Sequence, residues 1–272
     1  MWDTRRLADQ VDYISPGGVT EIRLLPSFEG GELVCARTAR GKVAAAGTQI
    51  GVGELFYVLE GDGELWRKTA VVEDVTALIP GRCVSIPPGI SYQFRAISDL
   101  DMLVATFPRW RRDDWRDVGP GYWDLEGQVL STAKLRPGPW STTDIGERYD
   151  YLAPDGSEIR LLPTYDNGGL AACRLPAGRI SSAVRHRTVQ EIWYVVDGSG
   201  QMWRADGEAE EVVDLDPATC VTIPTGVSFQ FRASESVSLD IVIATFPRWA
   251  GPDEAEPVGG HWRDPVVEDH QR

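Results

Sequence analysis

The hydrophobic residues of this 272-residue chain fall in short segments, and Gly or Pro interrupts them every eight to twelve residues. The segments are rich in β-branched and aromatic residues, and several alternate with a period of two, as in residues 191–196. Short, regularly spaced segments of this kind are typical of a β-sandwich or β-barrel. No window carries a long apolar stripe with a helical period, so the pattern predicts an all-β fold in which helix is confined to short pieces such as residues 4–10.

The chain contains two tandem copies of a similar sequence unit. The repeated segments are EIRLLP at 21–26 and 158–163, IPPGISYQFRA at 86–96 with IPTGVSFQFRA at 223–233, and ATFPRW at 105–110 and 244–249. They recur in the same order and at nearly the same spacing, which indicates an internal duplication. Residues 127–139 carry Gly, Pro and polar residues without a sustained period and form the candidate linker. We therefore expect two domains, at 1–130 and 131–272.

Two segments combine strand patterns with a Gly-rich centre. Residues 54–67 and 191–204 have this form, so we predict a β-hairpin in each. Strand alternation places Glu191 and Trp193 on one face of the second segment. The same rule places Phe229 and Phe231 together on one face of a later strand.

Composition and charge exclude several classes of function. The hydrophobic fraction of 42% and the charged fraction of 25% are those of a soluble globular protein. The net charge of −14 argues against nucleic-acid binding, which needs clustered Lys and Arg. No apolar run is long enough to span a bilayer, and the N-terminus lacks the hydrophobic core of a signal peptide, so we expect a cytoplasmic protein without a membrane partner.

Two motifs identify a family that the chain resembles. The residues that match them are Gly178, His186, Glu191 and Gly198 for the first motif, and Gly81, Pro87 and Gly89, with Pro224 and Gly226 in the second unit, for the second motif. They are similar to the two sequence motifs of the cupins, G-x5-H-x-H-x4-E-x6-G and G-x5-P-x-G-x2-H-x3-N. The whole chain resembles a bicupin. This resemblance implies two tandem jelly-roll β-barrels from an internal duplication, each with a pocket at one mouth.

The resemblance also implies a metal held by three His and one Glu, but the chain departs from that set. The corresponding residues are Gly47, Gln49, Glu54 and Tyr92 in the first unit, and Val184, His186, Glu191 and Phe229 in the second. A first-row divalent metal usually takes three or more His, Cys or carboxylate ligands. We therefore expect no cofactor. A divalent transition metal at His186 and Glu191 remains the alternative.

His186 and Glu191 are the candidate catalytic pair of the second unit. A hydrogen bond to Glu191 would orient the imidazole and stabilise its protonated form, whereas an apolar pocket would raise the pKa of Glu191 by desolvation. The sequence leaves both outcomes open. The expected ligand-binding residues are Gln49, Glu54, Phe56 and Tyr92 in the first barrel, and Gln190, Trp193, Phe229 and Phe231 in the second. In the first barrel these aromatic side chains either line a cavity or fill the interior.

Two functions from different classes fit these residues best. The first is a small-molecule enzyme that performs acid/base chemistry in an aromatic barrel pocket without a tightly held metal, as an isomerase, epimerase, cyclase or lyase. The second is a non-catalytic sensor or carrier that binds a small molecule. A metal-dependent, dioxygenase-like cupin is a further alternative. A homodimer through a sheet face is the protein partner that the family resemblance allows.

Overall fold

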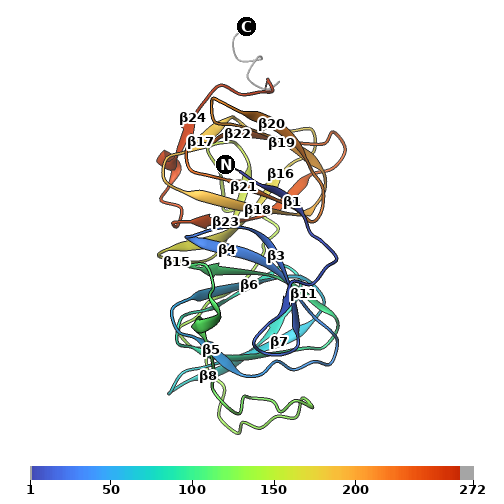
Figure 1. Ribbon diagram of the computed structural model, residues 1–272, viewed down its shortest axis with the longest axis vertical. Coiled ribbons are helices and arrows are strands. Elements are labelled where there is room, and N and C mark those ends of the chain that lie inside the picture. The colour runs from blue at the N-terminus through green and yellow to red at the C-terminus, as the bar shows by residue number, and fades with distance from the viewer. Residues whose placement is uncertain (1, 264–272) are drawn as a thin grey trace. The chain divides into compact units, whose positions relative to one another are not determined.

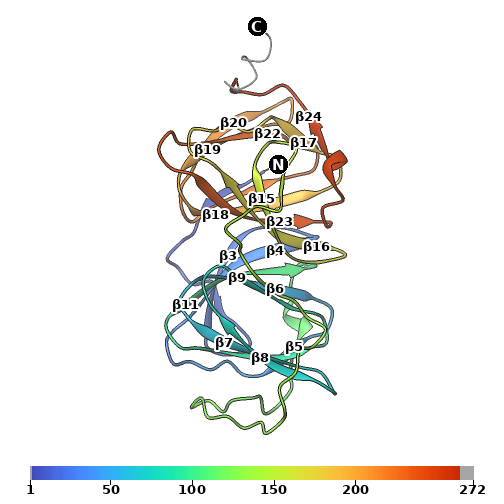
Figure 2. The same ribbon diagram turned by 180° about the vertical axis from the view of Figure 1, so that it is seen from behind.

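The computed structural model describes residues 2–263 of the chain, which form two compact units. The N-terminal unit contains residues 7–145 and 163–165, and the C-terminal unit contains residues 2–6, 146–162 and 166–263. Each unit consists of one seven-stranded and one five-stranded sheet (Figures 1 and 2). Both the predicted all-β class and the pair of jelly-roll domains are confirmed. None of the helices within residues 2–263 is long and apolar enough to cross a membrane.

The N-terminal unit places a seven-stranded sheet, in the order β13-β9-β6-β11-β4-β3-β2, against a five-stranded sheet, in the order β12-β5-β10-β7-β8. Its elements are β2 (Tyr13–Ile14), β3 (Thr20–Phe28), β4 (Gly31–Thr38), β5 (Gly47–Gln49), β6 (Gly53–Glu60), β7 (Gly63–Lys68), β8 (Glu73–Leu78), β9 (Arg82–Ile86), β10 (Ser91–Ala96), β11 (Leu100–Phe107), the short 3₁₀ helix η1 (Arg112–Asp114), β12 (Trp115–Asp117) and β13 (Thr142–Asp144). Buried apolar side chains from both sheets form one core cluster between them.

The C-terminal unit repeats this arrangement, with sheets in the orders β1-β21-β18-β23-β16-β15-β14 and β20-β19-β22-β17-β24. Its elements are β1 (Thr4–Arg6), β14 (Tyr151–Leu152), β15 (Glu158–Tyr165), β16 (Gly168–Leu175), β17 (Val184–His186), β18 (Gln190–Asp197), β19 (Gly200–Ala205), β20 (Glu210–Leu215), β21 (Thr219–Ile223), β22 (Ser228–Ala233), β23 (Leu239–Phe246), the short 3₁₀ helix η2 (Pro252–Glu254) and β24 (Ala255–Pro257). Its interior is also filled by side chains from both sheets.

The two predicted hairpins are wrong, although the strands themselves are present. β6 pairs with β9 and β11, whereas β7 pairs with β8 and β10, so the chain changes sheets between β6 and β7. β18 and β19 are separated in the same way. Gly61 and Gly198 each have φ of +83° in these turns. A Cβ at either position would also collide with a backbone carbonyl, that of Asp99 or Ser238. Glycine is therefore required at both crossings.

Each unit takes one edge strand from the other sequence repeat. β1, from the extreme N-terminus, pairs antiparallel with β21 of the C-terminal unit, and β13, from the segment after the predicted linker, pairs with β9 of the N-terminal unit. The helix expected near residues 4–10 is therefore wrong, because residues 4–6 form a sheet edge and residues 7–12 are not helical. Hydrophobic periodicity does not identify so short a strand, whose pairing partner lies more than 200 residues away. The expected ranges 1–130 and 131–272 did not anticipate this exchange.

A buried arginine holds each exchanged segment. The Arg67 guanidinium donates to the carbonyl oxygens of Ser85 at 3.0 Å and Ser141 at 3.2 Å, so it joins β9 to the residue just before β13. Arg204 repeats the arrangement, donating to the carbonyl oxygens of Thr222 at 2.7 Å and Asp3 at 3.0 Å. Both arginine side chains are fully buried. Because buried charge must be compensated, these hydrogen bonds tie the attachment of each edge strand to the stability of its unit.

Candidate functional site

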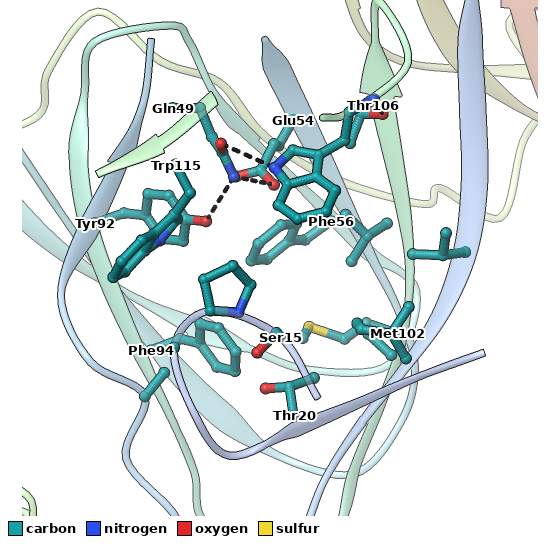
Figure 3. Close-up of a pocket in the computed structure, with 18 of the residues that line it drawn as sticks. Ser15, Thr20, Gln49, Glu54, Phe56, Tyr92, Phe94, Met102, Thr106 and Trp115 are labelled. Atoms are coloured by element: carbon teal, nitrogen blue, oxygen red, sulfur yellow. Dashed lines mark hydrogen bonds between the residues drawn. The ribbon is translucent and has the colours of Figure 1, made fainter. Parts of the chain in front are cut away.

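A cavity opens between the two sheets of the N-terminal unit. It contains about 670 Å³ of non-atom space, a volume that includes the open solvent at its mouth. Figure 3 shows Gln49, Glu54 and Thr106 at one end of this cavity, and Phe94 and Met102, with Ser15 and Thr20 near them, at the other. We call these the polar end and the apolar end. The first barrel is therefore open, which the sequence could not decide.

Three side chains form a hydrogen-bonded group at the polar end. The Gln49 side-chain amide donates to Glu54 Oε1 at 3.0 Å and to the Tyr92 hydroxyl at 3.4 Å (Figure 3). The Trp110 indole donates to Gln49 Oε1 at 3.2 Å, which fixes the direction of the amide. Glu54 Oε2 is buried and has no hydrogen-bond partner within residues 2–263. This oxygen is therefore an unsatisfied acceptor in the wall of the cavity.

Burial raises the pKa of Glu54 to about 7. Loss of hydration is the largest cause, the hydrogen bonds from Tyr92 and Gln49 oppose it, and the nearby Glu32 carboxyl adds to it. Burial and the Glu54 charge also raise the pKa of Tyr92, so that its hydroxyl stays protonated at neutral pH. Glu54 thus exchanges its proton close to neutral pH, while Tyr92 remains a hydrogen-bond donor.

Aromatic rings make up much of the cavity wall. Phe56 meets Tyr92 and Phe94 edge to face, with ring centroids 6.1 and 5.9 Å apart. Tyr13 and Trp110 stack nearly parallel at 6.1 Å, and both line the cavity. Edge-to-face and stacked pairs are the favoured geometries of aromatic side chains, so the wall is well packed as well as apolar.

Glu32 is a second carboxylate of the lining, but its oxygens have partners. Oε1 accepts from the Thr106 hydroxyl at 3.3 Å and from the Trp110 backbone N–H at 3.2 Å. Oε2 lies 3.5 Å from the Arg109 guanidinium. Burial raises the pKa of Glu32, and these contacts oppose the rise. Glu32 therefore holds the segment that carries Trp110 in place, whereas Glu54 keeps an oxygen free.

The shape of the cavity depends on two side chains of unequal size. Trp115 on β12 pairs with Gln49 on β5, and a Cβ at Gly47 would overlap the Trp115 indole. In the C-terminal unit the corresponding positions are Val184, which replaces the glycine, and Ala255, which pairs with His186 in the place of Trp115. A glycine facing a tryptophan has thus been replaced by a valine facing an alanine, so the two barrels are filled differently.

The predicted catalytic pair is brought together in the C-terminal unit. His186 Nδ1 lies 3.8 Å from Glu191 Oε2, and both side chains are buried. This distance is too long for a hydrogen bond, and Nδ1 has no hydrogen-bond partner in the described part of the chain. The Trp193 indole instead donates to Glu191 Oε2 at 2.7 Å. The His186 ring packs edge to face against Phe229 and Trp249.

Desolvation dominates the titration of this pair. Burial lowers the pKa of His186 to about 4 and raises the pKa of Glu191 to about 8. The Trp193 hydrogen bond lowers the Glu191 value, and the Asp155 and Glu254 charges raise it. At neutral pH the imidazole is therefore neutral and the carboxyl mostly protonated. The sequence left open whether Glu191 stabilises a protonated imidazole or is itself protonated in an apolar pocket. The structure shows the apolar pocket, which raises the pKa of Glu191.

The predicted aromatic residues of the second barrel are buried in its core. Trp193, Phe229 and Phe231 are at most 1% exposed and pack edge to face, with centroids 5.6 and 4.8 Å from the indole. They belong to the core cluster between the sheets, as does Val184. Gln190 is half-buried at the start of β18. Trp193 stands at the position that the smaller Phe56 occupies in the first barrel.

Neither unit provides the ligand set of the family's metal centre. In the first, the Gln49 amide is committed to Glu54 and Tyr92, so Glu54 is the one carboxylate at the four family positions and no imidazole is present. In the second, apolar Val184 and Phe229 stand at two of the positions, and Glu191 accepts from an indole. Within residues 2–263, no group of three or more His, Cys, Asp or Glu is arranged to hold a metal ion. The residues present do not fit that metal.

Several cavity residues were not predicted from the sequence. They are Tyr13, Glu32, Thr106, Trp110 and Trp115. Trp110 had a visible signal, because it ends the repeated ATFPRW segment. The others come from an edge strand, from the middle of the sheet and from the segment after η1, where strand alternation gives no indication of a pocket.

No family model and no curated protein sequence matches the chain. Solved structures do match its fold. The coconut allergen cocosin superposes with a TM-score of 0.71 at 13% identity, covering 99% of this chain and 92% of that one. Oxalate decarboxylase superposes with a TM-score of 0.70 at 12% identity, covering 98% of this chain and 83% of that one.

A structure of the Bacillus subtilis oxalate decarboxylase at pH 4.6 gives the same TM-score of 0.70 and the same 12% identity. These neighbours are bicupins, so the resemblance that the motifs predicted is confirmed, and the chain has the bicupin fold. Another structure of the Bacillus subtilis enzyme is described by its Mn(II) centres. At this level of identity the likeness concerns the fold alone.

Proposed function

We propose that the N-terminal barrel binds a small organic molecule and that Glu54 moves a proton on it. The observation that carries this proposal is the free Glu54 Oε2, a buried carboxyl oxygen without a partner at the polar end of an aromatic cavity. Its pKa of about 7 supports the proposal, because a general acid/base works best when its pKa lies near the working pH.

The chemistry requires one carboxyl and one fixed donor. The Glu54 carboxylate accepts a proton from a C–H or O–H bond of the ligand and returns it at a second atom, so that an isomerisation needs no oxidant or reductant. The protonated Tyr92 hydroxyl accepts from Gln49 and donates to the Glu54 carboxyl, so it orients the base at the same end. The packed aromatic wall excludes water, which strengthens both interactions.

The location differs from the pair that the sequence favoured. His186 and Glu191 lie in a barrel whose interior is occupied by Trp193, Phe229 and Phe231, and both groups are neutral at pH 7. Proton transfer to a ligand requires the ligand to reach the group. The open cavity beside Glu54 meets that condition, so we assign the reaction to the first barrel.

Hydrogen exchange tests the proposal without knowledge of the product. Small carbonyl and hydroxyl compounds are incubated with the protein in D₂O, and NMR follows deuterium entry at carbon. We expect Glu54→Gln to lower the exchange rate by roughly 10²- to 10⁴-fold, the usual contribution of a general acid/base. Glu191→Gln, at the matching position of the other barrel, should exchange like the wild type. Equal exchange rates in Glu54→Gln and wild type would refute the assignment. Loss of exchange in Glu191→Gln alone would instead assign the reaction to His186 and Glu191.

The second candidate is a non-catalytic binding protein. It is favoured because Glu54 is the one cavity carboxyl with an unpartnered buried oxygen, so a second base that could complete a two-base reaction is lacking in the described lining. A carrier or sensor would bind the same molecules, change its Trp110 and Trp115 fluorescence, and release each ligand unaltered and free of deuterium after prolonged incubation.

A further inference from the structure

The charge of the cavity is one-sided. Its charged lining residues are Glu32 and Glu54, and no Lys, Arg or His stands among the described residues that line it. Arg109, which contacts Glu32, is half exposed and lies outside the lining. An anionic ligand would thus meet the Glu54 carboxyl, on which no cation acts, and this is strongly unfavourable in a desolvated site.

Six aromatic side chains surround the same space. They are Tyr13, Phe56, Tyr92, Phe94, Trp110 and Trp115. The faces of such rings carry negative electrostatic potential and attract organic cations, and cages of several rings are a recurrent way to hold an ammonium group. The aromatic wall and the carboxyl group therefore favour the same sign of charge.

We infer that the ligand of the N-terminal barrel is a small organic cation, an amine in its ammonium form, whose charge pairs with Glu54 Oε2. This inference rests on the proposed function and names the substrate class of the same site. The apolar end, with Phe94 and Met102, holds the hydrocarbon part of the molecule (Figure 3). The partnerless oxygen accepts a hydrogen bond from the ammonium group, which satisfies a buried acceptor of the cavity lining that the protein leaves open.

Such a ligand also sets the protonation state of Glu54. The titratable groups that act on Glu54 or feel its charge are Tyr13, Glu32, Tyr92 and Tyr165, none of which is a cation. A bound ammonium group supplies the missing positive charge and lowers the pKa of Glu54. Binding therefore converts the Glu54 carboxyl group into the ionised form that accepts a proton. The substrate thus generates the carboxylate base that acts on it.

Three probes of similar size and different charge test the inference: benzylammonium, benzyl alcohol and benzoate. Titration calorimetry gives affinities, and repetition in buffers of different ionisation enthalpy gives the protons released. We expect benzylammonium to bind at least tenfold more tightly than benzyl alcohol, and benzoate to bind most weakly. At pH 7 benzylammonium should release about half a proton, because a group with a pKa of about 7 is half protonated there. Benzyl alcohol should release none.

Two variants separate this inference from the proposed function. Glu54→Gln should lose at least tenfold in affinity for benzylammonium and all proton release, while its affinity for benzyl alcohol stays within about threefold. Glu191→Gln should match the wild type with every probe. If benzyl alcohol or benzoate binds best and still depends on Glu54, the cationic class is wrong and the proposed site stands. If none of the probes binds, or if binding is indifferent to Glu54, both are overturned.

Discussion

Glu191→Gln should change how the stability of the C-terminal unit depends on pH. The side chain is 4% exposed, and burial raises its pKa from an ordinary 4.5 to about 8. Between these values the unfolded chain has released the proton and the folded chain still holds it, so the free energy of unfolding falls as pH rises. At about 1.4 kcal/mol per pH unit, the loss between pH 4.5 and 8 amounts to about 5 kcal/mol.

The glutamine variant lacks this loss because its side chain is neutral at every pH. It can still accept a hydrogen bond from the Trp193 indole through its amide oxygen. We therefore expect the variant to gain on the wild type by about 5 kcal/mol between pH 4.5 and pH 8, with most of the gain above pH 5. The contribution of Glu54, which has the same sign, is present in both proteins and cancels.

Urea unfolding at half-unit pH steps, followed by tryptophan fluorescence, measures the difference. Glu210→Gln is the matched control, since Glu210 also accepts from an indole, that of Trp203, but is exposed. A Glu191→Gln effect that stays constant across the pH range would refute the reasoning. It would mean that Glu191 is ionised in the folded protein and that a protonated His186 compensates its negative charge.

Three further results are expected. Burial lowers the His186 pKa to about 4, so the wild type should lose up to about 3 kcal/mol of stability as pH falls from 6.5 to 4. His186→Asn should not show this loss. NMR titration of the wild-type imidazole should find it neutral at pH 6. Gly47→Val should displace the Trp115 indole and weaken benzylammonium binding at least tenfold in calorimetry, whereas Gly51→Ala, where a Cβ makes only an ordinary contact with Asp114, should not. Elemental analysis of the purified protein and of His186→Ala should find well under one transition metal per chain in both; a stoichiometric metal lost in the variant would contradict the argument from the donor set.

The fold could be predicted from the sequence because the duplication shows each strand segment and motif twice. The resemblance to the cupins grouped Gln49, Glu54, Phe56 and Tyr92, and the structure finds all four in the lining of one cavity. Alternation describes only the direction of a side chain, however. It could not distinguish a hairpin from a crossing between sheets at Gly61, because both need a glycine with positive φ.

Whether a barrel interior is open depends on the volumes of side chains that are contributed by strands distant in the sequence. Trp115 stands beside Gly47 only after β12 has paired with β5, and the Trp193 indole fills its barrel only in combination with Phe229 and Phe231. The histidine and its family spacing directed attention to the second barrel. The unpartnered oxygen of Glu54 became visible only when the hydrogen bonds around it could be counted.

The exchange of β1 and β13 has a consequence for biosynthesis. β1 is made more than 200 residues before its partner β21, so the strand stays unpaired while all of the intervening chain is synthesised. The N-terminal unit likewise lacks its edge until residues 142–144 have been made. Pairing across so large a separation is slow, and an unpaired edge invites wrong partners. A gene cut at the repeat boundary would yield two incomplete sheets, each missing a strand that the other fragment carries.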